Sequence, residues 1–237
     1  MGIQIRETKS EEMQKNIRTV KQMTKGMGFD ENMGKVNWSF IRVISNFGYQ
    51  FMPKEKGVKY KKIRLDNVKA VVSEYGQANS ENIIMYIHGG GFVSGSASSS
   101  KGYSSMLAKY SGYKVIAIDY SLAPEHSFPK GFDDCYNAFC EIVRLYPNTK
   151  ITLVGESNLC LALALKTKEM GKVACVLVHS PIIDFTGGID RSEYRIDDFT
   201  VKEGCLKPLN EIYVGDNMAD NPYISPLFGD FHGFPPT

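Results

Sequence analysis

The sequence has little net charge: 28 lysines and arginines stand against 26 aspartates and glutamates in 237 residues, a formal charge of +2. A nucleic-acid-binding domain usually carries a clustered basic excess, and the one basic stretch, residues 54–69, is more typical of a solvated strand or loop. Hydrophobic residues make up 43% of the chain, too large a fraction for a disordered protein. We therefore expect a folded domain that does not bind nucleic acid.

Long hydrophobic runs are also missing, since none approaches the roughly 18 residues of a membrane span. Residues 1–25 are rich in charge and lack the apolar centre of a signal peptide. The cysteines are five in number, without any Cys-x-x-Cys pair, which favours reduced thiols over a disulfide framework or a zinc site. They are Cys135, Cys140, Cys160, Cys175 and Cys205. We predict a cytoplasmic protein without a membrane span.

The first fifty residues show helical rather than strand periodicity. Residues 10–23 are polar with apolar positions at helical spacing, and residues 36–51 hold a second set of spaced apolar residues. We interpret residues 1–55 as an N-terminal helical cap and residues 56–237 as the core domain. A stretch rich in Gly, Asp and Asn, at about 185–220, is typical of a cap-like insertion.

The core begins with two β-like stretches, 58–65 and 68–74, whose two-residue separation predicts antiparallel neighbours at one sheet edge. Short apolar runs then alternate with helix-like segments. The runs are 83–87, 114–118, 151–154 and 173–178, and the segments are 102–110, 132–146 and 159–170. This alternation predicts an α/β fold with a mostly parallel sheet, helices on both faces, and the carboxyl ends of the strands gathered along one edge.

Two of these runs end in glycine-containing motifs. The run that ends at Ile87 continues into HGGGF at 88–92, where consecutive glycines can turn and offer N–H groups to a developing negative charge. The run that ends at Val154 continues into GES at 155–157, the front half of a nucleophile elbow that lifts a serine above the sheet edge. The order of the two motifs is that of an oxyanion loop followed by a nucleophile.

Together with SPIIDFT at 180–186 and NPYISPL at 221–227, these motifs resemble the hormone-sensitive-lipase family of α/β-hydrolases, which are serine carboxylesterases and deacetylases of small acyl esters. The resemblance extends from about residue 58 to the last residue. It implies an acyl-enzyme mechanism, with no metal or organic cofactor, on a small acyl-ester or carbonyl-containing ligand.

The resemblance also implies roles for single residues. Ser157 would be the catalytic nucleophile, aligned with a histidine and an acid. The N–H groups of the oxyanion hole would come from Gly90, Gly91 and Asn158, while His88 and Gly89 would support the loop. Residues 119–129 would be family scaffold.

The chain departs from the family at the elbow, where Ala-Gly-Gly usually follows the serine. Here Ser157 is followed at once by Asn158 and Leu159. Either three residues are lost, or Leu159 replaces a glycine that lets helix and strand approach closely. A loss of three residues removes about 4.5 Å of helical rise, at a place where a shift of about 1 Å can cost on the order of a hundredfold in rate.

The acid and histidine of the triad are expected beyond Thr237, on the last strands of the fold, which are missing from this chain. Other residues of the chain follow Ser157 in the order that the triad requires, acid and histidine after the serine, and could replace the missing acid and histidine. They are Asp184, Asp197, Asp198 and Asp216 for the acid, and His179 and His232 for the base. His232 precedes the place of the next parallel strand and should lie at the opposite sheet edge, and for His179 a structural hydrogen bond is the better expectation.

We therefore expect a carboxylic ester hydrolase by family, with impaired turnover in this chain. One alternative is a non-catalytic binder of the same fold, whose glycine loop holds a ligand carbonyl or carboxylate. Another is an oligomerising fragment, because the strand at 173–178 would lack its expected neighbour and could pair with a second copy.

Overall fold

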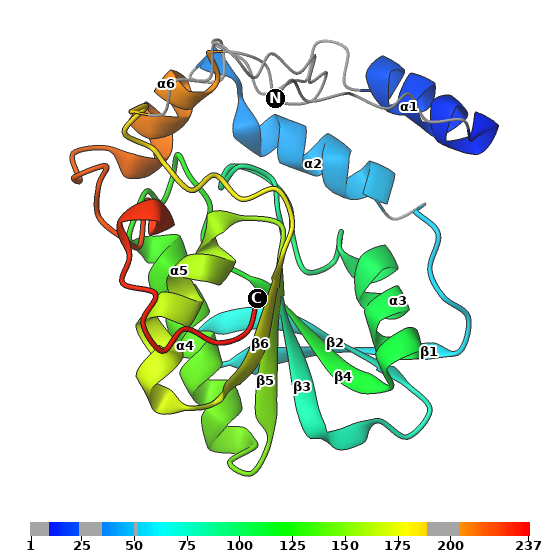
Figure 1. Cartoon of the computed structure of the whole chain (residues 1–237). Helices are drawn as coiled ribbons and strands as arrows, with labels where there is room; N and C mark the ends of the chain where they lie inside the picture. Colours follow the sequence, from blue (N-terminus) through cyan, green and yellow to red (C-terminus); the bar gives the residue numbers. More distant parts are fainter. Residues whose placement is uncertain (1–9, 24–34, 50–51, 189–203) are drawn as a thin grey trace.

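The computed structural model describes residues 10–23, 35–49, 52–188 and 204–237. A six-stranded sheet with the order β1-β2-β4-β3-β5-β6 forms its centre (Figure 1). The strands are β1 (Val58–Leu65), β2 (Val68–Tyr75), β3 (Asn79–Ile87), β4 (Tyr113–Asp119), β5 (Lys150–Gly155) and β6 (Val173–Val178). Buried apolar residues of the four central strands form the core between sheet and helices.

The antiparallel part of the sheet lies at one edge, as the sequence predicts. Leu65 pairs with Val68 across the turn between β1 and β2, and β2 also pairs antiparallel with β4. Asp66 in the turn has a φ of 52°, a conformation that Asp tolerates better than most residues. Only one face of β1 is shielded, because its side chains alternate between exposed and partly buried positions.

The parallel part consists of β4, β3, β5 and β6, and its register aligns the ends of the strands. Ile87 pairs with Ile118 on one side and Gly155 on the other, and Gly155 pairs with Val178. The chain therefore leaves β3, β5 and β6 at the same carboxyl edge, which is where such sheets bind ligands.

Helices cover both faces of the sheet, which confirms the predicted α/β fold. Helix α3 (Lys101–Ser111) packs on one face, while α4 (Lys130–Leu145) and α5 (Asn158–Thr167) pack on the other (Figure 1). The 3₁₀ helix η2 (Lys168–Met170) extends α5. Helix α5 is apolar on nearly all sides and lies almost wholly buried, as a helix with that composition must.

Two helices precede the sheet, α1 (Glu11–Met23) and α2 (Trp38–Tyr49). Helix α2 lies over the carboxyl edge of the strands (Figure 1). Arg42 ties it there: its Nε donates to the carbonyl of Val93 (2.6 Å), its Nη2 donates to that of Ala123 (2.5 Å), and Nη2 lies 2.9 Å from a carboxylate oxygen of Glu125.

The C-terminal region begins with α6 (Leu206–Leu209) and a π-helical turn, η3 (Asn210–Val214), and includes a short 3₁₀ helix, η4 (Pro226–Phe228). The last residues return to the sheet, where the N–H of Val176 donates to the carbonyl of Pro236 (2.8 Å). The outer edge of β6 therefore has a hydrogen-bonded neighbour from its own chain at this point. Within the described ranges, no helix is both long enough and apolar enough to span a membrane.

Candidate active site

The glycine loop leaves β3 through a run of left-handed conformations. Gly90, Gly91 and Phe92 have φ values of 119°, 56° and 64°, and the N–H groups of Val93 and Ser94 both donate to the carbonyl of Gly90 (3.1 Å each). A side chain at Gly90 would collide with the backbone and hydroxyl of Ser94. The motif is therefore a tight turn that requires glycine.

His88 holds this loop from inside. It is buried, its ring stacks on that of Tyr120 (4.3 Å between centroids), and the Tyr120 hydroxyl donates to the His88 carbonyl (2.9 Å). The Nδ1 atom lies 2.8 Å from the carbonyl of Gly89, so the proton belongs on Nδ1. Burial lowers the pKa of His88, which keeps the ring neutral near pH 7.

Ser157 is the N-cap residue of α5, with φ −155° and ψ 164°. This is ordinary extended backbone, whereas a nucleophile elbow is a sharp, strained turn. The side chain is 7% exposed, and its hydroxyl donates to Oδ1 of Asn158 (3.3 Å). Asn158 is buried, and its Nδ2 donates to the carbonyl of Ile224 (2.5 Å). The hydroxyl is therefore turned into the protein rather than raised above the sheet.

The immediate start of α5 explains this placement. Gly155 packs against the first turn of the helix: a Cβ there would lie 2.7 Å from Cβ of Cys160 and 3.3 Å from the carbonyl of Ile87. Helix and strand thus meet closely only a few residues after the strand ends. The segment between strand and helix is therefore too short to bring the Ser157 side chain up to the glycine loop.

The side chain that does reach the carboxyl edge is that of Glu156. Two hollows of about 460 Å³ and 380 Å³ adjoin there, and both are lined by Gly89, Gly90, Tyr103 and Glu156. We call these hollows together the glycine-loop cavity; Ser157 is not among the residues that line it. The exposed Glu156 carboxylate accepts a hydrogen bond from the buried Tyr86 hydroxyl (2.6 Å).

Sequence reasoning did not single out Glu156. The sequence does contain a signal for it. Glu156 directly follows a buried strand, and successive residues of an extended chain point to opposite sides, so Glu156 and Ser157 are expected to point in opposite directions. A Cβ on Gly89 would lie 2.9 Å from Oε2 of Glu156. The lack of a side chain at Gly89 thus leaves room for this carboxylate.

Among the candidate bases, His179 lies at the carboxyl edge and lines the smaller hollow. Its Nε2 is 3.0 Å from the hydroxyl of Tyr103, and its backbone N–H donates to the carbonyl of Gly155 (2.8 Å). His232 lies at the other end of α5, where its carbonyl accepts a hydrogen bond from Nζ of Lys168 (2.9 Å). The length of α5, about 1.5 Å per residue, separates His232 from Ser157.

The candidate acids do not gather with Ser157. Asp184 is buried, and its Oδ1 accepts hydrogen bonds from the N–H and the hydroxyl of Thr186 (2.8 and 2.6 Å), a local turn. Asp216 is exposed, and Asp197 and Asp198 lie outside the described residues. Over the described part of the chain, no cluster of three or more His, Cys, Asp or Glu side chains could hold a metal ion.

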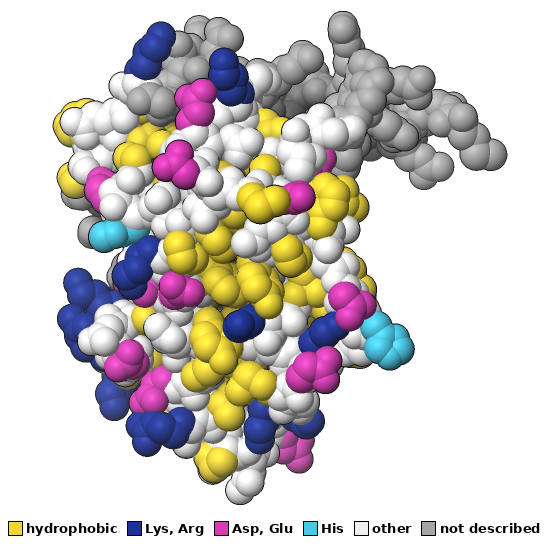
Figure 2. Space-filling view, turned by 90° about the vertical axis from the view of Figure 1, so that its left-hand side faces the viewer, with side chains coloured by type: hydrophobic (Ala, Val, Ile, Leu, Met, Phe, Trp, Pro, Cys, Tyr) yellow, Lys and Arg dark blue, Asp and Glu magenta, His cyan; other side chains and the backbone are white. Residues whose placement is uncertain are grey.

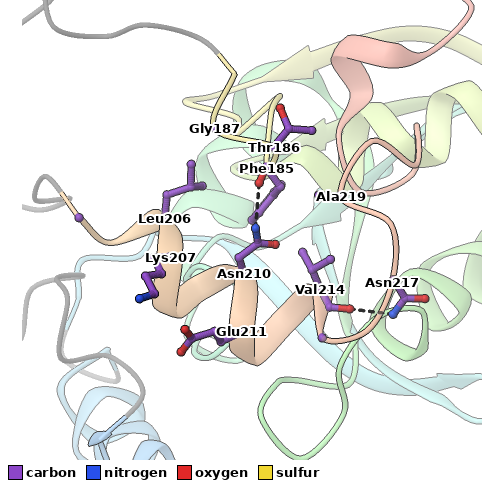
Figure 3. A pocket seen from close by; sticks show the side chains of 12 residues that line it. Phe185, Thr186, Gly187, Leu206, Lys207, Asn210, Glu211, Val214, Asn217 and Ala219 are labelled. Carbon is purple, nitrogen blue, oxygen red and sulfur yellow. Dashed lines mark hydrogen bonds between the residues drawn. The ribbon is translucent and has the colours of Figure 1, made fainter.

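A separate cavity of about 580 Å³ lies in the region expected to form an insertion (Figure 3). On its wall, Nδ2 of Asn210 donates to the carbonyl of Phe185 (2.9 Å). Phe185 also packs against Phe92 (5.9 Å between centroids), on which Tyr213 stacks (3.6 Å). An aromatic cluster thus connects this region to the glycine loop.

Comparison with known proteins agrees with the fold. Residues 84–237 match a family model described as the alpha/beta hydrolase fold. An esterase of Acinetobacter venetianus is 31% identical over 198 residues, which cover 79% of this chain and 64% of that protein. The chain spans less than two thirds of the length of the first curated relatives that it matches.

Solved structures give the same result. The crystal structure of a hormone-sensitive lipase from a metagenome library has a TM-score of 0.78 and 31% identity, over 92% of this chain and 75% of that one. A bacterial esterase of the hormone-sensitive lipase family has a TM-score of 0.83, over 97% and 77%, at 24% identity, which concerns the fold alone. This chain belongs to the hormone-sensitive-lipase family of α/β-hydrolases.

Proposed function

We propose that this chain binds small esters or other carbonyl-containing ligands at the glycine loop and hydrolyses carboxylic esters only near the background rate. The conformation of Ser157 carries the proposal: the residue is extended and 7% exposed, with its hydroxyl directed to Asn158. It is an impaired member of a serine hydrolase family rather than an efficient esterase.

The chemistry of the family explains why this conformation matters. The serine oxygen attacks the ester carbonyl carbon while a base takes the serine proton, and N–H groups, here those of Gly90, Gly91 and Asn158, hold the oxyanion. The alcohol then leaves with a proton, and water releases the acid from the acyl-enzyme. Oδ1 of Asn158 can accept a hydrogen bond from Ser157, but a carboxamide does not take up the proton near neutral pH.

The glycine-loop cavity supports the binding part of the proposal. The larger hollow, about 460 Å³, falls in the size range of small-molecule sites, and it reaches Gly89 and Gly90 without Ser157. Binding at the loop would therefore survive the loss of the serine hydroxyl.

A location in the cytoplasm is part of the proposal. The cysteines form no disulfide in the part of the chain that the structure describes, which suits a reducing compartment.

The test is turnover of p-nitrophenyl acetate and butyrate by the native chain and by Ser157→Ala, with the exposed Ser127→Ala as the matched control. All three should give the same rate, close to the background hydrolysis. A residual acceleration of about a thousandfold or less over water can come from an oxyanion hole alone, so it must persist in Ser157→Ala. Efficient turnover that only Ser157→Ala abolishes would overturn the proposal.

A further inference from the structure

The glycine-loop cavity carries a negative charge. Glu156 contributes an exposed carboxylate to both hollows, and no lysine or arginine is among the described residues that line them. The remaining wall consists of glycines, serine hydroxyls, two tyrosines, two methionines, a proline and two histidines, and His88 is kept neutral by burial. Glu156 is thus the dominant charge that a ligand meets.

A hydrogen bond holds one oxygen of this carboxylate in place. Oε1 accepts the proton of the Tyr86 hydroxyl, and Oε2 lies beside Gly89 at the loop. The pKa values of the neighbouring Tyr86 and Tyr103 are raised, mainly by burial. The nearby Glu156 carboxylate raises both pKa values further. The Tyr86 hydroxyl occupies Oε1, so Oε2 is the oxygen that a ligand would meet.

Cations on the nearest helix are engaged elsewhere. Helix α3, which carries Tyr103, has two charged side chains, both lysines. Nζ of Lys101 lies over the ring of Tyr60 (5.5 Å), and Nζ of Lys109 pairs with Glu55 (2.6 Å). The protein therefore provides the carboxylate with aromatic and hydroxyl neighbours, a combination that suits an organic cation.

We propose, building on the proposed binding function, that the glycine-loop cavity selects small carbonyl ligands that carry an organic ammonium group. The glycine-loop N–H groups would donate to the ligand carbonyl oxygen. Oε2 of Glu156 would accept a hydrogen bond from the ammonium group, with Tyr103 beside it. Ligands with a carboxylate at the same position would be repelled by Glu156.

Three ethyl esters of nearly equal size test this selection: ethyl 3-aminopropanoate, which is cationic at pH 7, neutral ethyl butanoate, and anionic monoethyl succinate. Their dissociation constants are measured by NMR-detected titration of the native chain. We expect the ammonium ester to bind at least tenfold more tightly than ethyl butanoate, and monoethyl succinate to bind most weakly. The preference should shrink between 50 and 500 mM NaCl, because salt screens the charge of an exposed carboxylate.

Glu156→Gln is the matched variant, since its amide oxygen can still accept the Tyr86 hydroxyl proton. It should bring the affinity for the ammonium ester down to about that for ethyl butanoate, whereas Glu169→Gln, an exposed change on η2, should alter nothing.

Equal binding of the ammonium and neutral esters, or a preference that Glu156→Gln retains, overturns the inference but not the proposed binding function. Failure of all three esters to bind overturns both. The salt dependence in the native chain decides the matter if Glu156→Gln does not fold.

Discussion

At the scale of single residues, the backbone of two neighbours determines which side chain a ligand meets. Ser157 is extended and faces Asn158, so Glu156, one residue earlier, points into the glycine-loop cavity. The chemical consequence is large, because a serine hydroxyl near an oxyanion hole is a nucleophile, whereas a carboxylate there is a charged binding group. A difference of one residue in register separates these two functions.

A second feature at this scale concerns Tyr213. Its ring stacks on Phe92, but its buried hydroxyl has no hydrogen-bond partner among the described residues. We expect Tyr213→Phe to leave the free energy of unfolding unchanged or to raise it by up to about 1 kcal/mol, because an unsatisfied buried hydroxyl is costly. Tyr213→Ala, the control that removes the ring, should lower it by about 3–5 kcal/mol. Urea unfolding measures both, and a clear loss of stability in Tyr213→Phe would refute this account.

At the scale of elements, α2 is held over the glycine loop by Arg42, which bonds two loop carbonyls and Glu125. The hydrogen bond from Arg42 is the main cause that lowers the pKa of Glu125 to about 2. The Glu125 side chain is 44% exposed, and solvent screening therefore limits the ion pair to less than about 1 kcal/mol.

The sign of the pH dependence follows from this shift. Because the folded pKa lies below the unfolded value, the ion pair stabilises the protein fully above about pH 5, and its contribution is lost as the pH falls toward 2. Glu125→Gln should therefore lower the urea midpoint slightly at pH 7, and its difference from the native chain should be mostly lost near pH 2.5 and vanish below pH 2. The exposed Glu81→Gln serves as control. A difference that stays constant from pH 7 to pH 2.5 would rule out the ion pair as its cause.

The elements themselves could be predicted from the sequence. The alternation of apolar runs and helical segments predicted strands β3 to β6 and helices α3 to α5 with ends displaced by a few residues, because burial on both faces leaves a strong pattern. Strands β1 and β2 were predicted from the two β-like stretches that precede it. The orientation of Ser157 could not be predicted. It depends on the approach of Cys160 to Gly155, a tertiary contact for which local sequence has no periodicity.

At the scale of the whole molecule, two surfaces bear on association. The edge of β6, expected to lack a neighbour, bonds Pro236 at Val176, although Leu177 remains half exposed. Figure 2 shows a band of hydrophobic side chains on the face that contains α4, α5 and the C-terminal segment. Leu227 and Phe228, in the C-terminal segment, are also exposed. Self-association through the β6 edge stays a prediction, and it would require the last residues to move.

The fold also explains why family membership and efficient catalysis are separate questions. The sheet has the family fold, and the glycine loop with its buried His88 lines a cavity that Ser157 does not line. Binding at the loop depends on the scaffold as a whole, whereas hydrolysis depends on a few atoms at the end of β5.

Reaction with a fluorophosphonate, followed by intact mass and peptide mapping, tests the central claim most directly, because the reagent modifies only a serine that is both accessible and activated. We predict no adduct at Ser157 in the native chain, under conditions in which an active bacterial esterase is fully labelled. Rapid, stoichiometric labelling of Ser157 would show that its hydroxyl reaches the glycine loop and would contradict this account.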